Sequence, residues 1–463
     1  MKRAKTLPPR NPQGSALVLS LIFIAMFSAL AAAMATISGT NVQVAENLCK
    51  ADMTRGCAES GLEVFRYWAS KVEVPGTTPP DQRFSLLATS LQSQLTAAGI
   101  TNIVPVVSGS TITISDVPLL SSGGQSFSAV LTKINNDTVQ LDVTGHYGSL
   151  SRTVRSNFLF GERAHTVFDY GLVSKGPISL SGSVDITGVN TRVESNAYIE
   201  SLDSLLALAI GGSSEISGNV KIVNPLAYVS LIGGKAAIGG DTGQAAMQHV
   251  TIGVPASEFP DMTPTIFEGY ATNVLSASTD FKKSQTLTNI KIPAGMNPKF
   301  TAQTTIRGVL FIETPNVVEF AGGVTVTGVM VTNGSQSDDS GTSQLIFNGN
   351  VSSYPVTELP QETQFAGLQS KTGTFIMAPG FAVAFGGNFS TLNGVIAANG
   401  VSFSGNAGGT VRGSVINYAN NQMCLSGNSD LCFNRSGLDQ VPAGFAPDIV
   451  LNYDRSSYSE VVL

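Results

Sequence analysis

Residues 401–416 read VSFSGNAGGTVRGSVI and contain the two elements that recur through much of the chain. The first element alternates apolar residues and ends in a glycine turn, and it recurs as ISLSGS (178–183), SEISGN (214–219), VEFAGG (318–323), LIFNGN (345–350) and VAFGGN (383–388). The second element is a short strand around a glycine, and it recurs as IRGVLF (306–311), VTGVMV (326–331) and LNGVIA (392–397). The two elements alternate with a period near 20, since Gly308 and Gly328 are 20 residues apart and Gly394 and Gly413 are 19 apart.

A period of this length, made of short strands and glycine turns, is typical of a β-solenoid. Each coil is too small to form a core alone, whereas stacked coils place Val, Ile, Leu and Phe in columns inside. Glycine suits the sharp turns because it readily adopts positive φ. We therefore expect a mainly β protein with a β-solenoid, a right-handed parallel β-helix, over residues 171–425. A looser β-sandwich is the alternative.

Three segments depart from the repeat. A mixed, proline-containing segment near residues 240–290 predicts a short helix and loop inserted across the solenoid. Residues 333–343 predict a surface loop; Asp338 and Asp339 in it could bind calcium, although a solvated loop is the simpler interpretation. Residues 426–463 are less repetitive, and we expect them to cap the open end of the solenoid.

Residues 75–170, which precede the repeats, predict a small α+β head. One helical face is apolar over residues 84–95, and the period then changes to two in STITIS, FSAVLT, TVQLDVTGHYG and SRTVRSNFLF. These segments are typical of antiparallel strands. His146 and His165 lie in or near this sheet with no Cys, Asp or second His at ligand spacing, so we expect no metal site there.

The N-terminal region contains an apolar run from Ser15 to Ile37 without a charged side chain, which is long enough to span a membrane as a helix. Four basic residues and no acid precede it, which predicts a cytoplasmic N-terminus and a body outside the cytoplasm: Lys2, Arg3, Lys5 and Arg10. A secretory signal peptide cut after Ala35 and a plain membrane anchor are two interpretations of this run.

A third interpretation is one continuous helix over residues 15–72, because small or apolar residues continue at steps of three or four beyond the run. This stripe consists of Val42, Ala45, Cys49, Met53, Cys57, Gly61, Val64 and Trp68. No proline occurs in the helix before Pro75. The first half would lie in the bilayer, and the second half would form a stalk whose stripe contacts partner helices.

A basic leader of residues 1–14, then Gly14, then a small residue opening an apolar helix, resembles the prepilin pattern. GSALVLSLIFIAMF and AENLCKADMTRGCAESGLEVFRYW are similar to the PilX-type minor pilins of type IV pili over about residues 10–70, and AESGLE also resembles tip pseudopilins of type II secretion. The resemblance implies cleavage by a prepilin peptidase between Gly14 and Ser15, anchoring in the inner membrane, and assembly with other pilins or pseudopilins.

The sequence departs from most pilins at Leu19, where they carry a glutamate. In the families that the chain resembles, that glutamate neutralises the N-terminal ammonium of a neighbouring subunit. An unpaired charge in the apolar core of a filament would be costly. A subunit that lacks it fits a filament tip, and this lack is shared with PilX-type and tip pseudopilins. A bulk, major-pilin role is therefore not expected.

Composition and motifs narrow the chemistry further. The net charge of −6 becomes about −10 without the four leader charges, which argues against nucleic-acid binding. Cys49 and Cys57 lie eight apart in one predicted helix and cannot bridge there, whereas Cys424 and Cys432 bracket a turn-rich loop that could close a disulfide ring. No linear catalytic motif or cofactor loop is present, and no acids recur at the coil period.

We therefore expect a tip-type pilin-like subunit, not an enzyme, that displays a structural or adhesive β-solenoid at a filament tip or the cell surface. The alternative is an exported or membrane-anchored β-helix protein that binds or acts on polysaccharide. We expect the solenoid to contact a surface ligand, whose class stays open at this point.

Overall fold

The computed structural model describes residues 13–120, 123–337, 341–437 and 441–461, which form two compact units. The head unit comprises the described residues up to 74, residues 78–161 and residues from 450 onward. The solenoid unit comprises residues 75–77 and 162–449. The leader residues 1–12, together with Asp338 and Asp339, lie outside the described residues.

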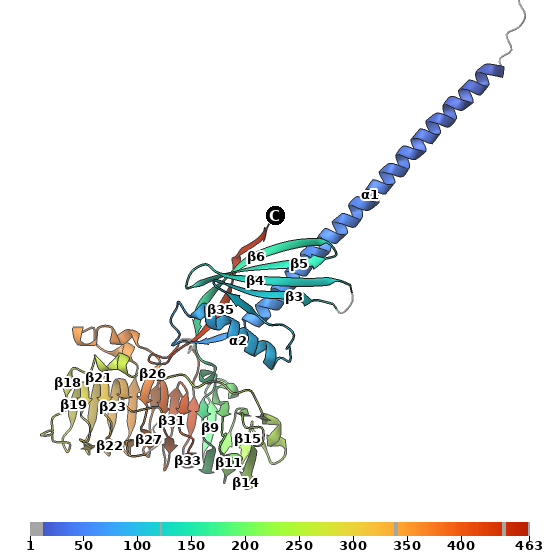
Figure 1. Cartoon of the computed structure of the whole chain (residues 1–463). Coiled ribbons are helices and arrows are strands. Elements are labelled where there is room, and N and C mark those ends of the chain that lie inside the picture. The colour runs from blue at the N-terminus through green and yellow to red at the C-terminus, as the bar shows by residue number, and fades with distance from the viewer. Residues whose placement is uncertain (1–12, 121–122, 338–340, 438–440, 462–463) are drawn as a thin grey trace, which may run out of the picture. The chain divides into compact units, whose positions relative to one another are not determined.

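The head unit combines two helices with one sheet (Figure 1). The helices are α1 (Gln13–Ala69) and α2 (Arg83–Ala97). The sheet has seven strands in the order β1 (Glu73–Pro75), β35 (Asp448–Val461), β6 (Leu150–Arg163), β5 (Thr138–Tyr147), β4 (Gln125–Lys133), β3 (Thr111–Pro118) and β2 (Val106–Ser108). Strands β2 to β6 pair antiparallel with their sequence neighbours, as the period of two predicted.

The last part of α1 packs directly against the head sheet, and glycine permits the close approach. A Cβ on Gly145 of β5 would lie 2.3 Å from the backbone nitrogen of Ala58 and from the backbone oxygen of Thr54. A Cβ on Gly61 would lie 2.5 Å from the ring of Phe127 on β4. Helix and sheet are therefore in contact at backbone distance, which leaves no room for a methyl group.

The solenoid unit consists of three sheets that wrap one apolar core. One sheet has the order β17 (Val250–Ile252), β13 (Val220–Ile222), β10 (Ala197–Ile199), β7 (Leu172–Ser174), β32 (Val415–Asn417), β29 (Val395–Ala398), β26 (Thr374–Ala378), β23 (Val324–Thr332), β21 (Thr304–Ile312), β19 (Gln285–Ile292) and β18 (Asn273–Val274), and β25 (Val351–Tyr354) also pairs with β23. The second has the order β14 (Tyr228–Ile232), β11 (Leu206–Gly211), β8 (Ile178–Gly182), β33 (Met423–Gly427), β30 (Val401–Phe403), β27 (Ala382–Phe385), β24 (Gln344–Phe347), β22 (Val317–Phe320) and β20 (Lys299–Phe300). The third, called the polar sheet below, has the order β16 (Asp241–Thr242), β15 (Ala237–Ile238), β12 (Glu215–Ile216), β9 (Asp185–Gly188), β34 (Leu431–Phe433), β31 (Gly409–Arg412) and β28 (Thr391–Asn393).

Successive coils pair in parallel, so the solenoid expectation is confirmed and the β-sandwich alternative is wrong. The right-handed sense stays a prediction.

The core contains an aromatic column in which each ring stacks on the next, with centroids 4.9 to 5.5 Å apart: Phe300, Phe320, Phe347, Phe385 and Phe403. The recurring Phe before the glycine turn thus forms the centre of the solenoid.

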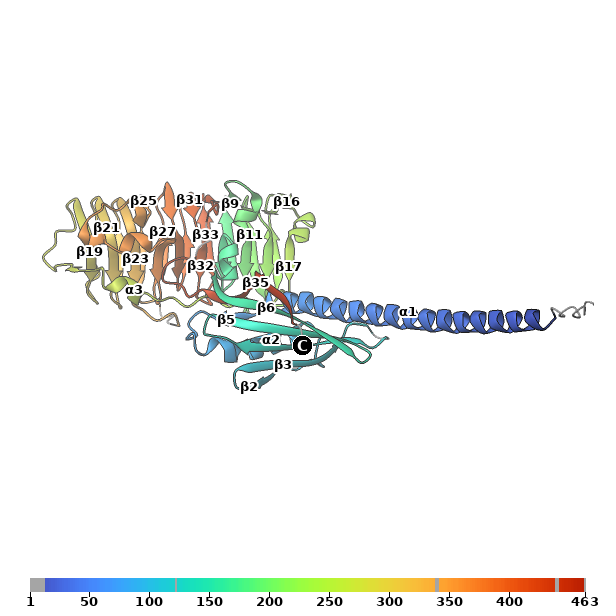
Figure 2. The same cartoon turned by 90° about the horizontal axis from the view of Figure 1, so that it is seen from above.

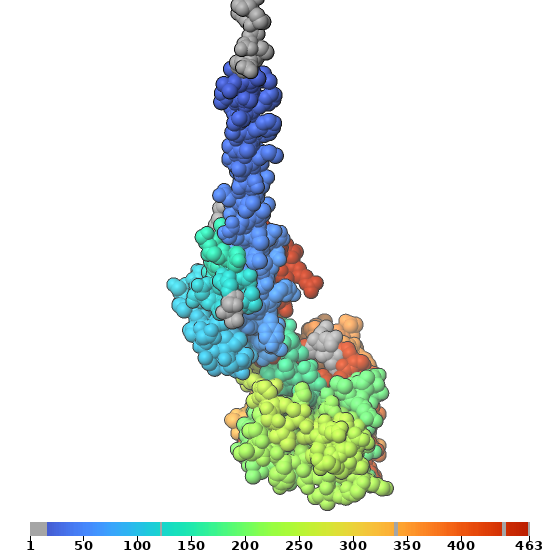
Figure 3. Space-filling model, turned by 90° about the vertical axis from the view of Figure 1, so that its right-hand side faces the viewer, coloured from blue at the N-terminus to red at the C-terminus, as the bar shows by residue number. Residues whose placement is uncertain are grey.

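The coils do not stack in sequence order. The first run of coils extends from β7 to β17 at one end of the stack. The second run begins at the opposite end with β18 and β19 and returns toward the first run. It ends where β32, β33 and β34 pair with β7, β8 and β9. Figures 1 and 2 show this junction, where red-orange C-terminal strands lie beside green ones. Figure 3 looks onto the end formed by the first run, in yellow-green. The first and last coils therefore meet in the middle of the stack.

A second apolar layer covers the outer side of the longest sheet. Its members come from that sheet and from the segments around it, including α3 (Thr265–Glu268) and the short 3-10 helices η1 (Thr166–Asp169), η4 (Val356–Glu358), η5 (Thr363–Phe365) and η6 (Leu368–Ser370). Two further 3-10 helices lie at corners of the first run, η2 (Arg192–Ser195) and η3 (Ala245–His249). The buried rings of Phe267 and Phe365 belong to this layer.

The C-terminal expectation needs a correction. The described residues among 426–463 do not form a cap on the solenoid, because β34 is a regular coil strand and β35 belongs to the head sheet between β1 and β6. The head segment ends at residue 161 instead of 170.

Candidate functional site

The exposed part of α1 is the first candidate surface. The helix over Ala16–Ala69 is long and apolar enough to cross a membrane, and its most apolar stretch is not buried by the rest of the described chain. Leu19 and Ile37 are 59% and 61% exposed. Gly14 and Ser15 lie within α1, and their side chains are outside the described residues. This segment has an apolar surface that no other described residue covers.

The predicted partner stripe divides into two parts. Val42, Ala45, Cys49 and Met53 are exposed, as a partner surface requires. Cys57 and Trp68 are buried, 3% and 7% exposed, and Val64 is half-buried. Trp68 lies 6.2 Å from the ring of Phe127, and burial raises the pKa of the Cys57 thiol. For Cys57 and Trp68 the expectation of partner contact is wrong. These two residues follow the helical spacing of the stripe because they pack against the sheet of their own head unit.

Cys424 and Cys432 also need a correction, since both are free thiols in the structure. Cys424 lies on β33 and Cys432 on β34, and these strands belong to different sheets. Both side chains point away from the core, because their neighbours Met423, Leu425 and Leu431 occupy the inward positions. Cys432 instead accepts a hydrogen bond from Thr187 Oγ1 at 3.3 Å in the first coil.

The junction of the first and last coils contains a buried carboxylate that sequence reasoning missed. Glu194 accepts hydrogen bonds from the backbone nitrogens of Asn190 (2.7 Å) and Arg435 (2.9 Å), and from Asn190 Nδ2 (2.9 Å). Burial raises the pKa of Glu194, but these bonds outweigh it and lower the pKa to about 2. Arg435 in turn donates to the backbone oxygens of Phe168 and Asp169. The ionised Glu194 side chain thus joins the first coil to Arg435, which lies 241 positions later in the chain.

Carboxylates of three coils follow one another on the polar sheet. Asp185 pairs in register with Glu215, and the Leu431–Ile186 pair brings Asp430 beside Asp185 on the other side. Burial, and to a lesser extent Asp430, raises the pKa of Asp185. The expectation that no acids recur at the coil spacing is therefore wrong for these three. The sequence conceals the row because Asp430 is in the last coil.

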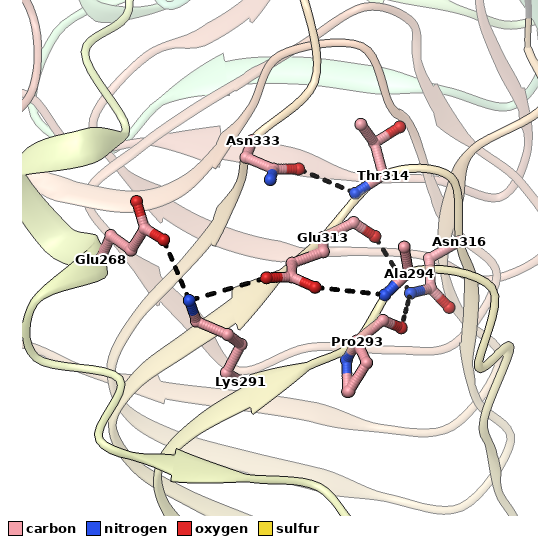
Figure 4. A network of polar contacts seen from close by, with 8 residues as sticks. All are labelled: Glu268, Lys291, Pro293, Ala294, Glu313, Thr314, Asn316 and Asn333. Atoms are coloured by element: carbon pink, nitrogen blue, oxygen red, sulfur yellow. Dashed lines mark hydrogen bonds and ion pairs between the residues drawn. The ribbon is translucent and has the colours of Figure 1, made fainter.

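A polar network on the second run joins neighbouring coils (Figure 4). Lys291 Nζ lies 2.9 Å from Glu268 and 3.6 Å from Glu313, and these contacts raise the pKa of Lys291. Asn316 Nδ2 donates to the backbone oxygens of Pro293 (2.7 Å) and Glu313 (3.0 Å). The dashed contacts in Figure 4 link residues of successive coils, so the network holds the corners of these coils together.

A buried histidine lies among the segments that connect the units along the chain. His165 is 6% exposed, and burial together with Arg163 lowers its pKa to about 4. The Asp448 carboxylate, 3.4 Å from His165 Nε2, opposes this shift, but we consider burial dominant. Across the described residues, no group of three or more His, Cys, Asp or Glu side chains is arranged to hold a metal ion.

No protein-family model matches the chain, and no curated protein matches it. Among solved structures, the chain is similar to the competence-associated pilin ComZ from Thermus thermophilus, with 12% identity and a TM-score of 0.28, over 89% of this chain and 97% of that chain. It is also similar to LeIBP, an ice-binding protein from an Arctic yeast, with 12% identity and a TM-score of 0.19, over 61% of this chain and 96% of that chain. Similarities this weak carry no argument about fold or activity.

Proposed function

We propose that this protein is a minor, tip-type pilin-like subunit that is anchored by α1 and displays the solenoid as a structural or adhesive module. One observation carries the proposal: α1 is a single helix of 57 residues whose apolar N-terminal part is exposed while its last part is fixed to an antiparallel sheet. A helix used only as a removable export signal would not need to continue into the core of the head.

The proposal assigns a role to each part of α1. Cleavage between Gly14 and Ser15 by a prepilin peptidase would release the leader, and Ser15–Ile37 would hold the subunit in the inner membrane with the body outside the cytoplasm. Val42, Ala45, Cys49 and Met53 would then face the helices of other pilins or pseudopilins. Leu19, in the position of the usual glutamate, favours a place at the tip, where no further ammonium needs a partner.

The mature N-terminus, determined by mass spectrometry of protein from its native membrane fraction, tests this proposal. We expect a chain that begins at Ser15. A chain that begins at Thr36 would contradict it, because a signal peptide would then have been removed. A matched variant, Gly14→Ala, should retain the leader, whereas Gly39→Ala should be processed normally because a Cβ there has nothing within 4 Å.

The alternative, a polysaccharide-active β-helix protein, is favoured by the row of Asp185, Glu215 and Asp430. Carboxylates on adjacent coils can share acid and base roles in glycoside cleavage. An Asp185→Asn variant separates the two functions: it should leave processing and assembly unchanged, whereas a loss of polysaccharide cleavage would establish the alternative. Our proposal assigns the chain no enzyme activity.

A further inference from the structure

We propose that a groove on the outer face of the polar sheet binds a carboxylate-bearing polysaccharide, with Arg412 holding the carboxylate. The inference deepens the adhesive part of the proposed function, because it rests on the displayed solenoid and names what that module would hold. The groove is lined by Pro355, Gly373, Asn393, Gly394, Arg412, Asn434 and Ser436.

Three of these side chains form a ladder across neighbouring coils. Asn393 of β28 and Arg412 of β31 are register partners. Asn434 follows β34, and its backbone nitrogen donates to the oxygen of Val411, which places it on the other side of Arg412. Neighbouring strands lie about 4.8 Å apart. The ladder thus presents an amide, a guanidinium and an amide at regular spacing.

Arg412 differs from two other arginines of the solenoid unit, Arg192 and Arg435. Arg192 donates to the backbone oxygen of Gly239, and Arg435 donates to two backbone oxygens. Arg412 is exposed, and within the described part of the chain no hydrogen bond or ion pair engages its guanidinium. It is also the one charged residue among those that line the groove. A guanidinium offers parallel donors that match both oxygens of a carboxylate.

The two asparagines are held so that polar atoms remain available. Asn393 donates from Nδ2 to the backbone oxygen of Ser353, and its backbone nitrogen bonds Ser353 Oγ at 2.8 Å. Its Oδ1 is left as an acceptor. Asn434 Oδ1 accepts bonds from Ser436 Oγ (2.7 Å) and Ser436 N (3.2 Å), which leaves its Nδ2 as a donor. Sugar hydroxyls, which both donate and accept, can use both groups.

Close stacking of the coils beside the ladder requires glycine at two positions. A Cβ on Gly394 would lie 2.7 Å from the backbone nitrogen of Phe375, and a Cβ on Gly413 would lie 2.6 Å from the backbone of Gly394. Both glycines also have positive φ, 124° and 157°. No other residue fits these positions without moving a coil, so the two glycines fix the close spacing of the coils that carry the ladder.

The acidic row on the same sheet does not oppose an anionic ligand strongly. Asp430 is four residues from Asn434 along its strand, which corresponds to about 13 Å. This separation exceeds the Debye length of about 8 Å at physiological ionic strength. A carboxylate at Arg412 is therefore largely screened from the acidic row, while a polymer continuing toward it would meet repulsion.

Calorimetric titration of the full-length protein in detergent micelles with oligogalacturonate tests the inference. We expect binding that weakens with salt and that Arg412→Gln reduces about tenfold or more. The matched control is Arg307→Gln, since Arg307 is also an exposed solenoid arginine but lies on the longest sheet outside the groove. The methyl-esterified oligosaccharide, which lacks the charge, should bind at least as weakly as the variant does.

Three results would overturn the inference: no binding, binding that Arg412→Gln leaves unchanged, or equal binding of the methyl ester. Competition by polyglutamate with equal strength would also overturn it, because the groove would then be a general anion site and not a sugar site. Unchanged far-UV circular dichroism of the variant excludes misfolding as the cause of a loss. None of these outcomes depends on N-terminal processing, so the inference and the proposed filament role fail separately.

Discussion

Replacement of Phe347 by alanine tests the aromatic column as the main source of solenoid stability. The Phe347 ring is fully buried and stacks on Phe320 at 5.5 Å and on Phe385 at 4.9 Å. Truncation of a buried Phe to Ala costs about 3 to 5 kcal/mol in total, a range that already includes lost aromatic contacts of about 1 kcal/mol each. Because both stacking contacts are lost and the neighbouring coils cannot collapse independently, we expect a cost in the upper part of that range, about 4 to 5 kcal/mol.

The assay can distinguish the two units because the single tryptophan, Trp68, lies in the head unit. Guanidinium unfolding followed by far-UV circular dichroism reports mainly the strands of the solenoid, and Trp68 fluorescence reports the head. The matched control is Ile346→Ala on the same strand, where the side chain faces outward and is half-buried; it should cost less than about 1.5 kcal/mol. The reasoning is refuted if Phe347→Ala costs no more than Ile346→Ala, or if only the Trp68 transition moves.

The remaining predictions concern glycine packing and acid stability. Gly145→Ala should destabilise the head by about 2 to 4 kcal/mol, because the added Cβ would meet the α1 backbone. Gly56→Ala should stabilise the head by about 0.5 to 1 kcal/mol, because a Cβ on this helical glycine has nothing within 4 Å. Urea unfolding followed by Trp68 fluorescence measures both changes. Glu194→Gln should cost about 2 kcal/mol of stability at pH 7. The parent should lose stability as the pH falls from 4.5 toward 2, and the variant should not show this loss in circular dichroism melts. An acid profile that the substitution leaves unchanged would contradict the pKa of about 2. The stability contributed by neutral His165 is fully present above pH 6.5 and is lost as the pH falls toward about 4, by about 3 kcal/mol. His165→Asn should therefore make the free energy of unfolding nearly independent of pH over this interval. A pH dependence as steep as that of the parent would refute this contribution of His165.

The sequence was sufficient to predict those elements that depend on a pattern within a short segment of the chain. The Phe that precedes each glycine turn predicted a stacked core, and Phe320, Phe347 and Phe385 form it. The alternation over residues 111–163 predicted the antiparallel head strands, because one face of each is buried. These patterns follow from the period of the backbone and the burial of one face, which a single sequence contains.

Relations between distant segments could not be predicted in the same way. The stripe through Cys57 and Trp68 has the same period whether it contacts a partner or its own sheet, so the pattern does not identify what covers it. The acidic row and the Glu194 junction depend on the last coil pairing with the first. That pairing needs residues 245 positions apart to meet, and no repeat in the sequence indicates that the stacking order reverses.

The return of β35 to the head sheet has a mechanical consequence. Residues 162–449 form an insertion between β6 and β35, so the solenoid is linked to the head through residue 161 and again through residue 450, and these two strands are neighbours in one sheet. A single proteolytic cut near either link would leave the solenoid tethered by the other. A pulling force on the module would be shared by two adjacent strands that are hydrogen-bonded to each other. Such a double tether suits a domain that must stay attached under load.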